Sequence, residues 1–505
     1  MSKAWLAALL LLTVTFIVTE PLFDFIDDEA TIVNDAADPV HVTLAKYLTA
    51  SGQHEHPPLY DLVLHFWLTV AGGRMRWLRI PSIAFYILGL SAIGMAVARI
   101  GSSGTSGMGR AAPWILALWP FGFHFGQVAA WYSLSFLLVG ALTIFFFEFA
   151  DSPNWPRLIR LLVTAAALLY TNYYGWALLA CLAIDFSIRR RDDWRSLVRW
   201  LIPSSVALAL IYLPMWKPFI AEVFGVVQPP QVGKALVAEP AFCLYSLFVS
   251  ESVAPWYSWI GVPLGIASVA CVILSLKLCQ GAARRFLIYF LILFAGMDVL
   301  GILETKRLLL IAPWLLIPIG VAVSGGNHLR VRNVLICLLA ITFLSGCAGI
   351  GLRKYYAAPR WVEPWPAVAS NAAAEWRKGG TIISNSPSFF LYLTYDLGLA
   401  GPDRAKFAGL LGKSLRESNI YAMDDWLAQG SPVTTEILLA KGVEFSEPGI
   451  AEQAETALTK RCEAPQVAKL YQDPGYELKE RFFPGLRQPE WRVEVRKYLC
   501  RQAPH

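Results

Sequence analysis

Long apolar stretches, separated by short polar segments, make up most of the chain up to residue 352. Apolar runs of roughly 17–22 residues allow a helix to cross the hydrocarbon core of a bilayer, which is about 30 Å thick. We expect spans close to 4–21, 80–100, 111–126, 132–150, 158–172, 174–188, 200–216, 257–277, 286–302, 308–324 and 333–352. The pattern predicts a polytopic α-helical membrane protein with about eleven spans.

Residues 22–79, between the first two predicted spans, have a different pattern. In Val40 to Leu48 and in Leu59 to Trp67 the apolar side chains recur at helical spacing on one side only. Such segments are typical of helices that lie in the membrane interface rather than cross it. We expect residues 22–79 to form a large first outer loop with two interfacial helices.

The tail, residues 353–505, alternates between helix and strand patterns. Ala367 to Lys378 has the pattern of an amphipathic helix. Strand patterns occupy Thr381–Ser384, Ile437–Leu439 and Arg492–Arg496. This alternation favours a small α/β domain of about 150 residues. The chain is thus expected to consist of a membrane domain, 1–352, and a C-terminal α/β domain, 353–505.

The composition agrees with a membrane protein. Of the 505 residues, 56% are hydrophobic and 16% are charged, and the mean hydropathy is +0.48. Soluble domains carry about 25% charged residues, so this excess of apolar side chains requires a bilayer. No segment interleaves basic and aromatic residues as nucleic-acid-binding surfaces do, and we therefore expect no nucleic acid partner.

Lysine and arginine are unevenly distributed between the two sets of predicted loops. One set carries Arg99, Arg110, Arg157, Arg160, Arg189, Arg190, Arg191, Arg195, Arg199, Lys277, Arg284, Arg285, Arg330 and Arg332. Because cytoplasmic loops carry the excess of positive residues, this side is expected to face the cytoplasm. The predicted location is the bacterial inner (cytoplasmic) membrane, with the N-terminus inside and the outer loop and C-terminal domain in the periplasm.

Three arginines break this rule. Arg74, Arg76 and Arg79 fall on the outer side, just before the second predicted span. The positive-inside bias disfavours arginine at such positions. These residues are therefore candidates for binding an anionic headgroup.

The eight cysteines fall into two groups. Those in or near predicted spans, where cysteine usually serves as a small apolar side chain, are Cys181, Cys243, Cys271, Cys279, Cys337 and Cys347. Cys462 and Cys500 lie in the tail, which is expected to occupy an oxidising compartment, and an even pair there suggests a disulfide. Two unrelated thiols are the alternative.

An acidic cluster follows the first span. Asp27, Asp28 and Glu29 stand at the expected membrane surface, where three like charges repel one another. Three consecutive side chains cannot all face one way, so one or two would point into a cavity. A carboxylate there is suited to act as a general base or to bind Mg²⁺ or Mn²⁺. A solvated helix end is the alternative.

A second ionisable group, His54, Glu55 and His56, lies in the same outer loop. Two histidines that flank a carboxylate are suited to bind a metal ion or to orient the first acidic cluster. Because the triplet stands directly before two prolines, a turn with solvated side chains is the alternative.

Lys306 and Arg307 begin a predicted span, directly after Glu304 and Thr305 on the outer side. Snorkelling of long basic side chains to the interface explains such positions. Binding of a lipid phosphate explains them equally well, because the guanidinium fork of arginine matches a phosphate group.

Aromatic residues gather at two outer span ends, Trp131-Tyr132 and Asn172-Tyr173-Tyr174-Gly175-Trp176. Tyrosine and tryptophan at span ends usually form an interfacial belt. A wall for a sugar ring or an isoprenoid chain is the functional alternative.

Six short motifs occur in order along the chain and on the expected side of the membrane. They are Asp28-Glu29, His56-Pro57-Pro58-Leu59-Tyr60, Arg79-Ile80-Pro81-Ser82, Trp131-Tyr132-Ser133-Leu134, Thr171-Asn172-Tyr173-Tyr174-Gly175 and Lys306-Arg307-Leu308-Leu309-Leu310. In this order they resemble the GT-C membrane glycosyltransferases of glycosyltransferase family 39 type. That family includes relatives of protein O-mannosyltransferases and of the aminoarabinose transferases that modify lipid A.

The resemblance implies many membrane helices, a catalytic first outer loop and a sugar donor linked to polyprenyl phosphate. In many members it also implies a divalent metal ion. The family's acidic pair falls on Asp28 and Glu29. The family arginine that is thought to hold the donor phosphate falls on Arg307, with Lys306 beside it.

The chain departs from the family pattern at two places. Val128 and Ala130 stand where many relatives carry a glutamate and an arginine, and Asn172 stands where relatives often have histidine. Both changes remove polar or ionisable groups near the expected cavity, so the donor sugar or the acceptor is expected to differ.

Together, the residues and the resemblance predict an inverting transfer of a sugar from polyprenyl phosphate or pyrophosphate to a hydroxyl group on the outer face. Asp28 would be the general base, and Arg307 and Lys306 would hold the leaving phosphate. Glu29, with Asp27 or Glu55, would position the acceptor or a metal ion. The supporting or acceptor-binding candidates are His56, Tyr60, Tyr132, Asn172 and Tyr173, and the candidate metal ligands are Asp28, Glu55 and His54.

No nucleotide cofactor is expected, because an enzyme at the outer face meets no nucleotide sugars. The expected partners are membrane lipids, the lipid-linked sugar donor and an acceptor that is a glycan, a lipid or a protein. A transporter or flippase of lipid-linked glycans would instead need ionisable residues in mid-span and inverted repeats. Asp185 and Asp298 are the main residues of that kind. A membrane-anchored binding protein would have its determinants in the tail.

Overall fold

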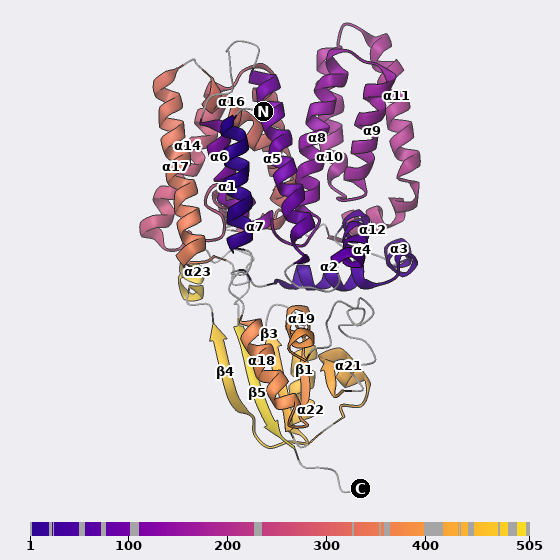
Figure 1. Cartoon of the computed structure of the whole chain (residues 1–505), viewed down its shortest axis with the longest axis vertical. Coiled ribbons are helices and arrows are strands. Elements are labelled where there is room, and N and C mark those ends of the chain that lie inside the picture. Colours follow the sequence, from indigo (N-terminus) through magenta and orange to yellow (C-terminus); the bar gives the residue numbers. More distant parts are fainter. Residues whose placement is uncertain are drawn as a thin grey trace.

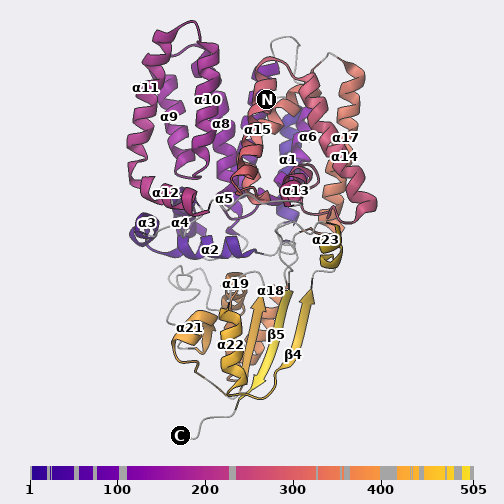
Figure 2. The same ribbon diagram turned by 180° about the vertical axis from the view of Figure 1, so that it is seen from behind.

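The computed structural model describes residues 3–19, 23, 25–49, 56–71, 77–101, 111–226, 235–325, 328–352, 355–357, 364–397, 418–432, 434, 436–442, 449–472, 475–482 and 492–500. It consists of a helical bundle and, at one end of the bundle, an α/β domain (Figures 1 and 2). The first helix begins toward the other end of the bundle, and the last strand ends at the tip of the α/β domain (Figure 1).

Most predicted spans form helices that run along the length of the bundle (Figure 1). These are α1 (Lys3–Thr19), α5 (Ile80–Gly101), α8 (Tyr132–Asp151), α9 (Trp155–Leu169), α10 (Gly175–Arg189), α11 (Trp194–Ile211), α14 (Ser258–Leu278), α15 (Gly281–Val299), α16 (Pro313–Ser324) and α17 (Leu329–Leu352). Glycine lets α5 and α8 approach closely, because a Cβ added to Gly89 would lie 2.5 Å from the Phe136 ring.

Four helices within the described residues, α5, α8, α14 and α17, are each long and apolar enough to cross a membrane. A fifth span results if α11 and the segment Leu213–Glu222, which meet at a bend of 58°, are counted as one. Helices α1 and α16 are apolar but shorter. The structure thus confirms apolar membrane helices, and the count of eleven stays a prediction.

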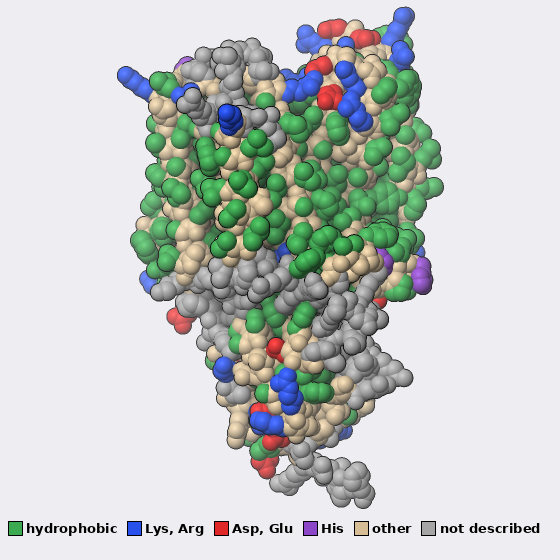
Figure 3. Space-filling view, in the orientation of Figure 1, with side chains coloured by type: hydrophobic (Ala, Val, Ile, Leu, Met, Phe, Trp, Pro, Cys, Tyr) green, Lys and Arg blue, Asp and Glu red, His purple; other side chains and the backbone are tan. Residues whose placement is uncertain are grey.

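The surface of the bundle matches a lipid environment. Hydrophobic side chains cover its flank, and basic side chains gather at the end away from the α/β domain (Figure 3). Leu10, Ile17 and Trp259 are among the exposed apolar residues, each at least 66% exposed. A soluble surface rarely carries so continuous an apolar band. The arginine-rich junction between α10 and α11 lies at the end opposite the α/β domain.

The predicted span over residues 111–126 is wrong as a single helix. The chain forms α6 (Ala112–Ala117) and then α7 (Pro120–Phe125), with Leu118 and Trp119 between them. Pro120 has no backbone N–H and clashes with a preceding helical turn, so α6 cannot continue through it.

The predicted span over 308–324 also starts differently, with a 3₁₀ helix, η4 (Thr305–Leu310), ahead of α16. Residues 217–256, expected as a loop, include α13 (Ala235–Val249) and most of α12 (Trp216–Val226). A short 3₁₀ turn, η3 (Leu213–Met215), precedes α12. These segments are apolar but short, which is why their pattern did not predict a span.

Three helices of the first outer loop lie at the end of the bundle that faces the α/β domain (Figures 1 and 2). They are α2 (Asp27–Ala37), α3 (Val40–Thr49) and α4 (Leu59–Ala71). The last two correspond to the predicted interfacial helices. Helix α2 was not predicted, and the acidic cluster forms its first turn.

The α/β domain contains a five-stranded sheet in the order β2-β1-β3-β5-β4. The strands are β1 (Thr381–Ser384), β2 (Ile420–Ala422), β3 (Glu436–Gly442), β4 (Gln466–Gln472) and β5 (Arg492–Leu499). Strand β1 is parallel to β2 and β3, and β5 is antiparallel to β3 and β4. The accompanying helices are α18 (Trp365–Trp376), α19 (Pro387–Asp396), α21 (Met423–Ala428), α22 (Ile450–Thr459) and α23 (Tyr476–Phe482).

Helix α18 and strands β1, β3 and β5 correspond to predicted elements, whereas β2 and β4 do not. A disulfide joins Cys462 and Cys500, the two cysteines of the tail. It ties the end of β5 to the segment that follows α22.

The α/β domain packs against the outer loop through α19 and α2. The backbone N–H of Phe25, just ahead of α2, donates to the Tyr392 hydroxyl over 2.6 Å. Trp365 and Phe389 belong to the same buried hydrophobic cluster as the core of the bundle. The start of α2 is therefore held from both sides, by the bundle and by the α/β domain.

Candidate active site

Asp28, the second residue of α2, lies where three distant parts of the chain meet. The Tyr132 hydroxyl, at the start of α8, donates to Asp28 Oδ2 over 2.8 Å. The Lys306 ammonium, on η4, lies 3.3 Å from the same oxygen. The Asp28 side chain is 34% exposed, so it remains reachable from solvent. A carboxylate that is both anchored and accessible is suited to accept a proton.

Glu29, its neighbour, is fully buried and engaged at both oxygens. Arg79 donates to it twice, from Nε to Oε1 over 2.8 Å and from Nη2 to Oε2 over 2.6 Å. The backbone N–H groups of Ala129 and Ile26 donate to Oε1 and Oε2 over 2.7 and 3.1 Å. These bonds fix the first turn of α2 and the loop before α8. They support a role for Glu29 in positioning Asp28 rather than in touching an acceptor.

Arg79 therefore does not bind a headgroup in this structure, and that prediction is wrong. Its side chain is 1% exposed, it pairs with Glu29, and its Nη1 donates to the Phe23 carbonyl over 2.9 Å. Its guanidinium also lies over the Phe25 ring, 4.2 Å from the centroid. The sequence pattern predicted an outward-facing Arg79 because it does not reveal that Glu29 is a buried partner for this side chain. Arg74 and Arg76 lie outside the described residues.

The two cations of η4 share a second carboxylate. Glu304 Oε2 lies 3.6 Å from Arg307 Nε and 3.9 Å from Lys306 Nζ. Arg307 is 5% exposed at its side chain, donates from Nη1 to the Ile302 carbonyl over 3.2 Å, and stands over the Tyr174 ring at 5.6 Å. The acidic start of α2 and the cationic pair 306–307 thus converge at one end of the bundle, as the sequence predicted.

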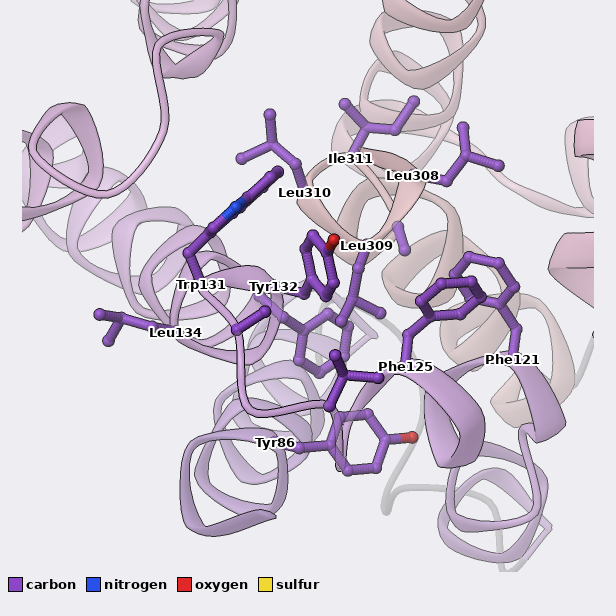
Figure 4. Close-up of a cluster of buried hydrophobic side chains, with 14 of the residues drawn as sticks. Tyr86, Phe121, Phe125, Trp131, Tyr132, Leu134, Leu308, Leu309, Leu310 and Ile311 are labelled. Carbon is purple, nitrogen blue, oxygen red and sulfur yellow. The ribbon is translucent and has the colours of Figure 1, made fainter. Parts of the chain in front are cut away.

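A cluster of buried hydrophobic side chains surrounds Tyr132, which donates to Asp28 (Figure 4). Tyr132 packs edge-to-face on Trp131 at 4.5 Å and against Phe125 at 6.2 Å. Figure 4 shows Tyr132 beside Leu309 and Leu310, which are buried on η4. Because the ring is held by these contacts, its hydroxyl is directed at Asp28 without a further ordering cost.

His56 and Tyr60 lie in the buried floor of the outer loop. His56 Nδ1 lies 3.0 Å from the Pro57 carbonyl, and its ring stands between those of Tyr47 and Trp131 at 5.9 and 5.8 Å. The Tyr60 hydroxyl is hydrogen-bonded to Ser82 Oγ over 2.7 Å, and burial raises the pKa of Tyr60. Both side chains therefore link α4 to the bundle.

Asn172 and Tyr173 lie in the turn between α9 and α10. Asn172 Oδ1 accepts from the Tyr174 N–H over 2.9 Å, and its buried Nδ2 has no hydrogen-bond partner among the residues that the structure describes. Tyr173 is 2% exposed, and burial raises its pKa. The turn places the Tyr174 ring against Arg307, so this predicted group does border the site.

The metal prediction remains a prediction. His54 and Glu55 lie outside the described residues, and so does the side chain of Asp27. Among the residues that the structure describes, no group of three His, Cys, Asp or Glu side chains could hold a metal ion. Asp28, the one described candidate ligand, faces an ammonium group, which opposes a cation there. The described residues alone do not fit a divalent ion.

Two buried contacts near η4 were missed at the sequence level. The Thr305 hydroxyl donates to Glu251, which is fully buried. His124 on α7 is hydrogen-bonded to Ser250, whose φ is +66°. The signal was Ser250-Glu251-Ser252, a polar triplet directly after an apolar run. The first contact holds η4 against the segment that follows α13, and the second joins α7 to the same segment.

A buried acid in α4 was also missed. Asp61 is fully buried and accepts a hydrogen bond from the Tyr47 hydroxyl of α3. Burial raises the pKa of the Asp61 carboxyl well above its ordinary value, against the opposing effect of the Tyr47 hydrogen bond. Burial and the charge of Asp61 likewise raise the pKa of Tyr47. The pair joins α3 to α4.

Asp185, one of the residues expected to mark a transporter, has structural partners. It is fully buried near the end of α10 and pairs with Arg189 over 2.6 Å and with Arg285 of α15. The Tyr289 hydroxyl also donates to it over 3.3 Å. This cluster lies at the arginine-rich end of the bundle, away from Asp28.

The same fold occurs in solved structures. ArnT from Cupriavidus metallidurans, in a crystal structure with bound undecaprenyl phosphate, matches 98% of this chain and 98% of its own, with a TM-score of 0.55 and 14% identity. Its apo structure matches 96% of this chain and 97% of its own, with a TM-score of 0.51 and 13% identity. No protein-family model and no curated sequence matches the chain. The likeness confirms the GT-C fold expected from the sequence.

Proposed function

We propose that this protein transfers a sugar from a polyprenyl-phosphate-linked donor to a hydroxyl acceptor at the outer face of the cytoplasmic membrane. One observation carries the proposal: the accessible Asp28 carboxylate lies 3.3 Å from Lys306, next to Arg307, at one end of an apolar bundle. The fold is that of ArnT, which was crystallised with undecaprenyl phosphate. A base and a phosphate-binding cation side by side are what such a transfer needs.

In the proposed reaction Asp28 accepts the proton of the acceptor hydroxyl. The acceptor oxygen forms a bond to the anomeric carbon, and the bond from that carbon to the donor phosphate oxygen breaks. The electron pair remains on the phosphate, where Lys306 and Arg307 stabilise the charge that develops. Attack opposite the leaving group inverts the anomeric configuration. Protonated Asp28 then returns its proton to solvent, to which its side chain is 34% exposed.

The neighbours of these residues would act by positioning. Tyr132 holds the Asp28 oxygen by a hydrogen bond of 2.8 Å. Glu29 and Arg79 fix the turn that carries Asp28. Misplacement of a catalytic group by about 1 Å can cost roughly 100-fold in rate, so these contacts are expected to matter although they touch no substrate.

An apolar groove between α8, α9, α10 and α11 is suited to the prenyl chain of the donor. Its volume is about 240 Å³, and its lining includes Phe146, Leu158, Trp176 and Leu208. Trp176 lies two residues from Tyr174, whose ring faces Arg307. A chain in this groove would therefore bring its phosphate end toward the cationic pair.

The orientation proposed from the sequence agrees with this site. Basic loops lie at the end of the bundle opposite the α/β domain (Figure 3). With that end in the cytoplasm, the site and the C-terminal domain are periplasmic.

The test is donor turnover by purified protein in nanodiscs. A panel of polyprenyl-phosphate sugars is incubated with it, and donor loss and polyprenyl phosphate formation are followed by mass spectrometry. The Asp28→Asn variant should lose about 100- to 10,000-fold in turnover, the usual contribution of a general base. Asp38→Asn is the matched control, since Asp38 pairs with Lys46 on the same outer loop. Near-normal turnover by Asp28→Asn would refute the assignment.

No specific observation among the described residues favours transport. Asp185, a buried acid within the bundle, is engaged by two arginines and a tyrosine.

A further inference from the structure

Among the described residues, two carboxylates lie beside the two cations of η4. Lys306 Nζ lies between Asp28 Oδ2 at 3.3 Å and Glu304 Oε2 at 3.9 Å. Arg307 Nε lies 3.6 Å from the same Glu304 oxygen. Both cations that the proposed function assigns to the donor phosphate therefore have a carboxylate within 4 Å.

The two carboxylates are held differently. Asp28 is anchored by the Tyr132 hydroxyl and contacts Lys306 at hydrogen-bond range. Among the described residues Glu304 Oε2 is buried without a hydrogen-bond partner, because its distances to the two cations, 3.6 and 3.9 Å, are too long for a hydrogen bond. The Glu304 side chain as a whole is 43% exposed. Glu304 therefore interacts with the two cations by electrostatic attraction alone. Its carboxylate can move away from them without breaking a hydrogen bond.

We propose that Glu304 is a positioning residue that competes with lipid phosphate for Arg307 and Lys306 and thereby promotes release of the polyprenyl phosphate product. The inference rests on the proposed function and adds to it a discrimination between donor and product. A phosphate that reaches the two cations must either displace the Glu304 carboxylate or lie close to it. Either event weakens phosphate binding relative to a site without that negative charge.

Donor and product differ in charge, so Glu304 is expected to affect their affinities to different extents. The donor is a phosphodiester with one negative charge. The product is a phosphomonoester, which carries about −1.5 to −2 near pH 7 because its second pKa is near 6. A fixed negative charge repels the product more than the donor. Glu304 therefore lowers the affinity for product more than the affinity for donor.

The test measures binding of undecaprenyl phosphate to the full-length protein in phosphatidylcholine nanodiscs, together with donor KM and product inhibition. Glu304→Gln keeps the side-chain shape and removes the charge. It should tighten undecaprenyl phosphate binding about fivefold, the scale of one partly exposed ion pair, and change donor KM less. The difference from wild type should shrink below pH 6, where the product approaches a single charge.

Three further variants make the outcomes separable. Glu304→Asp retains the charge and should stay near wild type, and Asp38→Asn, which alters an acid away from the cations, should not tighten binding. Unchanged or weaker product binding by Glu304→Gln would overturn the inference alone. If wild type and Arg307→Gln bind undecaprenyl phosphate equally, or neither binds it, the phosphate site itself is wrong and the proposed function fails with it.

Discussion

Replacing Arg79 by methionine would leave the Glu29 carboxylate buried without its cation. The structure gives the size of this loss: two hydrogen bonds to Glu29, of 2.8 and 2.6 Å, and one to the Phe23 carbonyl, of 2.9 Å. Both side chains are at most 1% exposed. Removing one partner of such a buried pair costs about 3–5 kcal/mol, because the remaining charge stays desolvated.

A matched control is available at the other end of the bundle. Arg99 pairs with Asp151 over 2.6 Å, but the two side chains are 39% and 52% exposed. An exposed pair of this kind contributes about 0–1 kcal/mol. Arg99→Met makes the same chemical change as Arg79→Met, so the difference between the two variants isolates burial.

The assay is thermal unfolding of both variants in the same nanodiscs at one scan rate. Arg79→Met should lower the apparent melting temperature several times more than Arg99→Met. The double variant Glu29→Gln/Arg79→Met should recover part of the loss, because it no longer buries an unpaired charge. Equal shifts for Arg79→Met and Arg99→Met, or a double variant that is no more stable than Arg79→Met, would refute the reasoning.

Three further outcomes are expected. Tyr132→Phe removes the hydroxyl donated to the proposed base and should lower turnover about tenfold, the scale of a hydrogen bond to a charged group, with little change in melting temperature. Because burial raises the pKa of Asp61 in the folded protein, stability should fall as the pH rises from about 3.9, the ordinary aspartate value, toward the raised one. Melting curves over that range should show a flatter dependence for Asp61→Asn. Reducing the Cys462–Cys500 disulfide, whose partners are 38 residues apart, should destabilise the C-terminal domain by about 4 kcal/mol, seen as earlier proteolysis of the tail.

Local sequence patterns were sufficient to predict most of the helices in the bundle and the outer loop. Run length and apolar periodicity predicted α5, α8, α14 and α17, and one-sided periodicity predicted α3 and α4. These features depend on neighbours a few positions apart, which a sequence displays directly. The loop charge bias also placed the acidic cluster and residues 306–307 at one end, where Asp28 and Lys306 lie 3.3 Å apart.

Partners far apart in the sequence could not be predicted in this way. Nothing local distinguishes Glu29 from Asp28, and the inward side chain is decided by Arg79, 50 positions later. The same applies to Glu251, whose partner Thr305 follows 54 positions later. The helix break at Pro120 could have been predicted from the sequence, because a proline inside a helix removes a hydrogen bond. Treating that whole apolar run as one span overlooked it.

The C-terminal domain takes part in the same arrangement that presents Asp28. Tyr392 of α19 accepts a hydrogen bond from the Phe25 N–H, and the Phe25 ring lies 4.2 Å from the Arg79 guanidinium. Arg79 in turn pairs with Glu29, which lies next to Asp28 in the first turn of α2. These contacts connect the α/β domain, through Phe25, Arg79 and Glu29, to the first turn of α2. The tail thus has a structural reason to accompany the bundle: it supports the turn that carries the proposed base.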